Sequence, residues 1–208
     1  MIHMPIPISL VAVIMFSVWL RFVIGRSNQE NVKKNRHFWE LERKANSARK
    51  VDISNLDYLT IPLEQLPMKD HEDSTINSYR DTILSLSDKK ILNLTGLTNT
   101  DLKLKYGAAN LNKLTAYDNN YIQLISILQK WGERLYSLGY MAEATSVLEY
   151  ATTCQTDVLG TYRLLSKIYK ETNKPDKITQ LIHTIQGSTI NRKELILAEL
   201  NKILSSNL

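Results

Sequence analysis

The chain has 208 residues, of which 43% are apolar and 23% are charged, an ordinary globular composition that excludes bulk disorder. Seven Gly and five Pro, beside many Leu, Ile, Lys, Asn and Tyr, argue against an all-β fold and predict an all-α one. The formal net charge is +5, and much of this excess lies between Arg21 and Lys50. The single cysteine, Cys154, excludes an intramolecular disulfide and fits a reducing compartment.

An apolar run occupies residues 6–24, and Arg21, close to its downstream end, is its only charge. A helix over this run would be about 28 Å long, near the thickness of the hydrocarbon core of a bilayer. We therefore expect residues 1–26 to form a single transmembrane helix. A cleaved signal peptide and a buried apolar helix are the alternatives. A signal peptide carries positive charge before its apolar run and small residues after it, and neither feature is present.

The charges on either side of this run orient the expected span. Only His3 precedes the run, whereas many Lys and Arg follow it, so the positive-inside rule places the N-terminus outside and the C-terminal domain in the cytoplasm. The expected localisation is the cell membrane, single-pass, with the lipid bilayer as one partner. The aromatic and basic side chains expected at the membrane interface are Trp19, Arg21, Arg26, Lys33, Lys34 and Arg36.

Residues 27–50 begin with a Ser-x-x-Glu capping box and continue with helix formers, which predicts a basic juxtamembrane helix. Its charges either bind anionic headgroups or form a solvated flank. Residues 51–69 contain Pro62 and Pro67, which disfavour a helix at the residues before them, so we expect an extended connector there. The connector is too apolar for a free linker, so we expect it to lie across the domain surface or to be a docking segment.

A helical domain is expected over residues 70–208, with its first helix at 70–86, where apolar residues recur at three- and four-residue spacing. Within residues 87–107 two interpretations stay open. Alternating Leu and Lys from Leu102 favour a short strand, whereas Asp101 favours the start of a helix. Residues 109–131 predict a further helical stretch with a soft break at 118–120.

The C-terminal half contains an internal repeat. Within residues 125–158, small and apolar side chains stand at Gly132, Gly139, Ala144, Leu148 and Ala151. The same places in a second copy are occupied by Ser166, Asn173, Ile178, Ile182 and Ile185. This pattern, over residues 121–191, resembles the tetratricopeptide repeat (TPR) family, whose period of about 34 residues matches this offset. The resemblance implies a TPR-like α-solenoid, and the amphipathic segment 189–205 looks like its capping helix.

The second copy departs from the family, because Ile178 and Ile185 stand where small residues are usual. A plain helical bundle therefore stays open as the alternative fold. In TPR arrays the first helix of each pair lines a concave groove, and the resemblance places there Gln129, Glu133, Tyr136, Arg163, Lys167 and Lys170. The last three share one helix face, and related domains hold peptide carboxylates with such residues. The implied partner is a protein bound through an acidic or C-terminal segment; a solvated lysine-rich face is the alternative.

The sequence contains no pattern typical of catalysis or metal binding. The four histidines are scattered without metal-ligand spacing, and we expect no catalytic residues, no metal and no cofactor. Cys154 is expected to be a small buried hydrophobic residue in the second helix of the first copy. The basic residues do not interleave with aromatics, so no nucleic acid is expected. The expected function is that of a membrane-tethered adaptor or scaffold rather than an enzyme; a small structural subunit of a larger membrane complex is the alternative.

Overall fold

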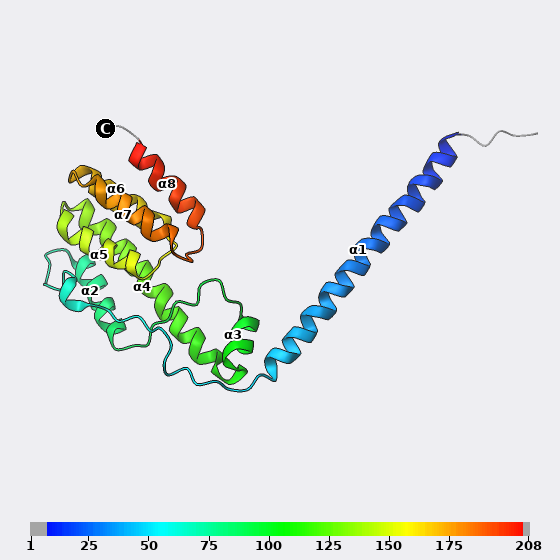
Figure 1. The fold of residues 1–208 in the computed structure, drawn as a ribbon, viewed down its shortest axis with the longest axis horizontal. Coiled ribbons are helices and arrows are strands. Elements are labelled where there is room, and N and C mark those ends of the chain that lie inside the picture. The colour runs from blue at the N-terminus through cyan, green and yellow to red at the C-terminus, as the bar shows by residue number, and fades with distance from the viewer. Residues whose placement is uncertain (1–7, 206–208) are drawn as a thin grey trace, which may run out of the picture. The chain divides into compact units, whose positions relative to one another are not determined.

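The computed structural model describes residues 8–205, except for the side chains of residues 8–14 and 24–34. The regular elements of the described residues are helices, which confirms the predicted all-α class (Figure 1). The chain divides into two compact units. The N-terminal unit comprises Met1–Val51 with Asn99–Ala109, and the C-terminal unit comprises Asp52–Thr98 with Asn110–Leu208.

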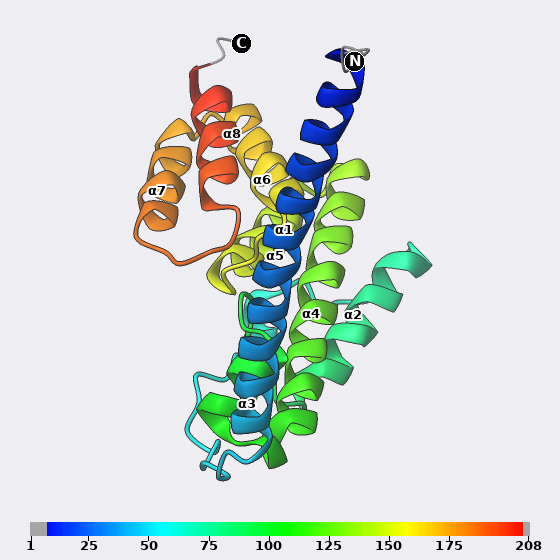
Figure 2. The same cartoon turned by 90° about the vertical axis from the view of Figure 1, so that its right-hand side faces the viewer.

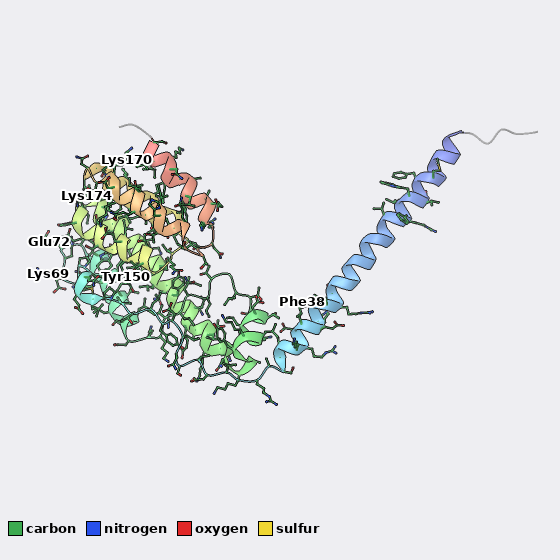
Figure 3. The ribbon with its side chains drawn as sticks, viewed as in Figure 1. Phe38, Lys69, Glu72, Tyr150, Lys170 and Lys174 are labelled. Atoms are coloured by element: carbon green, nitrogen blue, oxygen red, sulfur yellow. The ribbon has the colours of Figure 1, made fainter. Side chains whose placement is uncertain are left out.

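The N-terminal unit is built from α1 (Ile8–Asn46) and α3 (Asn99–Tyr106). Glu42 of α1 accepts a hydrogen bond of 2.8 Å from the Thr100 hydroxyl and forms an ion pair with Lys103. Hydrogen bonds from Lys103 and Thr100 hold the pKa of Glu42 below its usual range. The exposed side chains of Phe38, labelled in Figure 3, and Trp39 form an edge-to-face pair on α1. Of the two interpretations left open within residues 87–107, the helix is confirmed over the strand, and Asp101 lies in the first turn of α3.

The predicted transmembrane span and the predicted single-pass localisation are wrong. None of the helices in the described part of the chain combines the length and the apolar character needed to cross a membrane. Within the described residues, the apolar stretch of α1 from Ile8 to Leu20 extends for about 20 Å before the charge of Arg21, against the roughly 30 Å of a bilayer core. Residues 1–7 of the predicted span lie outside the described residues.

The residues predicted at a membrane interface lie along α1, which runs for 39 residues without a new start at Ser27. The predicted anchor and juxtamembrane helix are therefore parts of one helix from residue 8 onward. The side chains of Trp19, Arg21 and Arg36 are exposed on it. Those of Arg26, Lys33 and Lys34 lie outside the described residues. The prediction that these six residues contact a lipid bilayer is therefore withdrawn.

The C-terminal unit begins with the predicted connector, which packs on the core of this unit. Ile61 and Leu66 are each only 6% exposed and flank the short 3₁₀ helix η1 (Leu63–Gln65). The backbone N–H of Leu59 donates to the Ile91 carbonyl over 3.0 Å. Burial of these apolar side chains explains why the segment does not behave as a free linker.

The helix α2 (Ser74–Ser87) buries Ile76, Ile83 and Leu86 in the core of the C-terminal unit. Asp73 is its N-cap: the carboxylate accepts from the backbone N–H groups of Thr75 and Ile76, at 2.9 and 3.0 Å. The same carboxylate forms an ion pair with Arg134 of α4 (Leu111–Ser137). The guanidinium of Arg134, with the two N–H groups, lowers the pKa of Asp73 to about 2.

A lowered pKa of Asp73 predicts a specific acid sensitivity. A carboxyl group with a folded-state pKa of about 2 and an ordinary value of 3.8 stabilises the fold above pH 3.8, and this contribution is lost as the pH falls towards 2. Asp73→Asn keeps a capping oxygen but removes the charge, so we expect its unfolding temperature to fall less steeply between pH 4 and 2 than that of the wild type. Thermal unfolding followed by circular dichroism measures this slope. The matched control, Asp88→Asn, removes an exposed carboxylate at the other end of α2 and should keep the wild-type slope; equal slopes for all three proteins would contradict the prediction.

The remaining helices of the C-terminal unit follow one another along the chain, and α6, α7 and α8 lie side by side (Figure 1, Figure 2). Their bounds are α4 (Leu111–Ser137), α5 (Met141–Thr153), α6 (Leu159–Glu171), α7 (Pro175–Gln186) and α8 (Lys193–Ser205). The predicted soft break at residues 118–120 is absent, because the polar side chains there bind a neighbouring loop. Asp118 accepts from the Leu94 N–H at 3.1 Å, and the Asn120 amide donates to the Lys90 carbonyl at 2.9 Å. These residues therefore do not compete for the backbone of α4.

The buried positions of these helices repeat at the offset found in the sequence. The buried residues of α5 are Ala144, Val147, Leu148 and Ala151. The residues of α7 that follow them by 34 positions are also buried; these are Ile178, Leu181, Ile182 and Ile185. In the same way, four buried residues of α4 have buried counterparts in α6; these pairs are Leu128 and Tyr162, Trp131 and Leu165, Gly132 and Ser166, and Leu135 and Tyr169. Both copies therefore present the same faces to the core.

The turns within the two helix pairs are equivalent as well. Gly139, at φ 87°, and Asn173, at φ 55°, occupy the same left-handed position in the two copies. The next residue in each turn donates its N–H to a carbonyl five residues back, from Tyr140 to Leu135 at 3.0 Å and from Lys174 to Tyr169 at 2.7 Å. This six-to-one bond is typical of a Schellman helix end. The repeat is therefore present in backbone conformation as well as in side-chain burial.

Candidate partner-binding groove

A groove of about 630 Å³ lies on the C-terminal unit between α4, the loop 94–97 and the linker 157–158. Its apolar lining includes the buried Leu94 and Ile125 and two large side chains left exposed, Ile122 at 59% and Leu97 at 40%. A large apolar side chain exposed on its own is common on protein surfaces. Two of them lining one concavity together with polar groups are typical of a binding site.

One face of α4 forms a long wall of this groove. Ile122, Ser126, Gln129 and Glu133 line the groove and follow one another at three- and four-residue spacing, which places them on one side of the helix. Gln129 and Glu133 were predicted at a groove from the TPR resemblance. Ile122 and Ser126 were missed, although extending the same spacing towards the N-terminus of the helix would have found them.

Gln129 joins two helices at the wall of the groove. Its side chain is 9% exposed; its amide oxygen accepts from the Thr161 hydroxyl at 2.5 Å, and its amide N–H donates to Glu133 at 2.5 Å. A Cβ atom at Gly160 would lie 2.8 Å from the Gln129 amide nitrogen. Gly160 therefore provides the space in which Gln129 links α4 to α6.

Tyr136 and Lys167, both predicted at the groove, lie together further along α4 and α6. The Tyr136 hydroxyl donates to Glu171 at 2.8 Å, and the Lys167 ammonium lies 5.0 Å from the centre of the Tyr136 ring. The hydrogen bond with Tyr136, and to a smaller extent the charge of Glu171, raise the pKa of Lys167. These side chains lie outside the lining of the groove.

The two other predicted basic residues contact α8. Arg163 donates through Nε to Glu199 at 2.7 Å, and Lys170, labelled in Figure 3, donates to the Ile203 carbonyl at 3.0 Å. The guanidinium of Arg163 lowers the pKa of Glu199. The six predicted residues therefore form three separate groups, of which only Gln129 and Glu133 line the groove.

The charged groups of the groove are mainly acidic. Its lining contains the carboxylates of Asp118, Glu133 and Asp157 and one cation, Lys130. Tyr121 also lines the groove, and its hydroxyl lies within hydrogen-bonding distance of the Cys154 and Gln155 carbonyls. Burial raises the pKa of Tyr121, with smaller contributions from nearby negative charges that include both aspartates. The groove thus combines an apolar lining with a negative charge balance.

Comparisons of the chain with protein-family models, with curated proteins and with solved structures gave no match. The C-terminal unit repeats its burial pattern and its turn geometry from one helix pair to the next, and a groove lies along α4.

Cys154 is buried at the end of α5, as predicted, with only 2% of its surface exposed. Burial raises the pKa of its thiol to about 11, so the reactive thiolate is scarce at neutral pH. We expect the folded protein to resist alkylation by iodoacetamide at neutral pH and to react fully in denaturant. The matched control carries Thr153→Cys in a Cys154→Ala background and moves the thiol to an exposed position, where it should react quickly without denaturant. Equal rates for the two folded proteins would contradict this prediction.

Proposed function

We propose that this chain is a non-enzymatic protein-interaction module that binds a linear segment of a partner protein in the groove along α4. The observation that carries the proposal is the exposure of Ile122 and Leu97 in a concavity of about 630 Å³. A partner that removed these side chains from water would gain about 25 cal/mol for each Å² of apolar surface buried.

The TPR resemblance supports the same proposal. The offset found in the sequence recurs in the buried faces of α5 and α7 and in the two left-handed turns. In such arrays the first helix of each pair lines the binding surface, and α4 is the first helix of the first pair. The proposed module is therefore TPR-like, with α8 closing its C-terminal end.

The two functions expected from the sequence, a membrane-tethered adaptor and a subunit of a membrane complex, both placed the chain at a membrane. The membrane location is withdrawn together with the predicted span. Binding of a protein segment depends only on the C-terminal unit, so it does not require a span.

The groove is tested by selecting peptides from a displayed random library on the full chain and measuring their affinity. Ile122→Glu places a charge in the apolar lining and should weaken binding at least tenfold, because burial of a side chain of this size contributes about 1.5–3 kcal/mol. The matched control, Leu84→Glu, alters a side chain that is 41% exposed on α2 and should leave affinity unchanged.

Unfolding curves for both variants establish that they are folded. Peptides that bind the two variants equally well would show that the groove is not the binding site, and a library that yields no binder would contradict the proposal as a whole.

A further inference from the structure

We infer that the segment bound in this groove carries apolar side chains flanked by Lys or Arg. The inference rests on the proposed function and specifies the chemistry of the partner. It is carried by the charges that line the groove and by their order along α4.

The carboxylates lie at both ends of the apolar wall. Asp118 stands four residues before Ile122, and Glu133 stands four residues after Gln129, so that an acidic group flanks each end of the lining that α4 provides. At a rise of 1.5 Å per residue, Asp118 and Glu133 are about 22 Å apart along the helix axis. An extended chain covers that distance with about seven residues. The segment that fits has an apolar centre and a basic residue towards each end.

The third carboxylate comes from outside α4. Asp157 belongs to the linker between α5 and α6, beside Val158, and lines the same groove. Lys130 is the one basic residue among the lining residues that the structure describes. Three carboxylates against one ammonium attract a basic segment and repel an acidic one.

The acidic partner implied by the TPR resemblance would require the basic residues of α6. Arg163 is paired with Glu199, and the Lys170 ammonium donates to the Ile203 carbonyl. Lys167 lies near the Tyr136 ring and 3.8 Å from Glu171. Each of these cations has a partner within the chain, and none of them lines the groove. Charge complementarity in the groove therefore favours a basic partner.

The inference is tested with four synthetic peptides of equal length and the full chain. The first has a leucine pair flanked by lysines, the second has glutamates in place of the lysines, the third has glutamines there, and the fourth has the lysines with serines in place of the leucines. Fluorescence anisotropy at low ionic strength gives the four affinities. We expect the first peptide to bind best, with binding about tenfold weaker for the third and weakest for the second and fourth.

Variants of the chain connect this preference to the groove. Asp118→Asn, Glu133→Gln and Asp157→Asn should each weaken binding of the lysine-flanked peptide about two- to fivefold, whereas Lys130→Glu should strengthen it by a similar factor. Asp118→Asn keeps an oxygen that can accept from the Leu94 N–H, so the loop retains this contact. The matched control, Asp88→Asn, removes a carboxylate at the end of α2 outside the groove and should change nothing.

Tighter binding of the glutamate-flanked peptide, or no effect of the three neutralising variants, would overturn the inference. The proposed function would survive that result if Ile122→Glu still weakened peptide binding at least tenfold. Binding of a leucine-containing peptide that is insensitive to Ile122→Glu would overturn both.

Discussion

Replacing Trp131 with alanine is expected to reduce the free energy of unfolding by about 3–5 kcal/mol, the loss typical of a fully buried aromatic residue. The side chain of Trp131 is completely buried on α4, within the core that α4 shares with its neighbouring helices. Truncation removes its buried apolar surface and leaves a cavity that the surrounding helices fill only in part. Denaturation by urea, monitored by circular dichroism, measures the loss.

Two further variants separate burial from other effects of the Trp131 change. Ile122→Ala shortens an exposed side chain on the same helix and should cost less than about 1 kcal/mol. Trp131→Phe keeps an aromatic ring and removes an indole N–H that has no hydrogen-bond partner among the described residues, so its loss should lie between the other two. A loss below about 1 kcal/mol for Trp131→Ala would contradict the packing of α4.

The second large effect is expected where α4 and α5 approach each other. A Cβ atom at Gly132 would lie 2.6 Å from Cδ2 of Leu148, whose side chain is fully buried and has little room to move. Alanine in place of an exposed helical glycine stabilises a helix by about 1 kcal/mol. The overpacking caused by Gly132→Ala should cost about 1–3 kcal/mol and exceed that gain, and Gly132→Val should cost more.

The chain itself supplies a control for Gly132. At Gly187 the nearest atom to an added Cβ is 3.8 Å away, so Gly187→Ala should be nearly neutral. Combining Gly132→Ala with Leu148→Val should recover part of the loss, because the shorter side chain withdraws from the clash. Additive losses in this double mutant, measured by urea denaturation, would show that the two residues are not in contact.

The sequence predicts those features of the fold that depend on local spacing. The repeat was visible at positions such as Gly139 and Asn173, because a left-handed backbone at the end of a helix favours Gly or Asn. A helix was predicted at residues 70–86 from its apolar period, and α2 covers Ser74–Ser87. Its start was missed by four residues, because capping by Asp73 sets it. Where one face of a helix is buried, apolar residues recur in the sequence at three- and four-residue spacing, and this spacing predicts the helix.

Other features depend on contacts between distant segments, and the spacing of residues along the sequence does not predict such contacts. The Asp-Asn-Asn stretch at 118–120 favours a break by local preference, yet its side chains bind the loop 90–94 and α4 continues. The apolar run at 6–24 has nearly the length of a span, but the helix that contains it continues into polar sequence, and none of the described helices is long and apolar enough to cross a membrane. Length and apolar composition alone were therefore insufficient to define a span.

The candidate site was predicted in part, for the same reason. Projection of a helix face found Gln129 and Glu133, which lie on the wall of the groove. Projection could not show that Arg163 would meet Glu199, because that contact depends on where α8 packs. Nor could it find Leu97, which approaches α4 through the fold of a loop distant in sequence.

The claim that the groove along α4 binds a partner segment is tested most directly by amide hydrogen exchange. Exchange is measured on the full chain alone and with a saturating amount of a peptide selected from the displayed library. Binding in the groove predicts slower exchange in the loop 94–97, along residues 118–133 of α4 and at the linker 157–158, with the rest of the described chain little changed. Protection confined to other elements, such as α1 or α8, would contradict it.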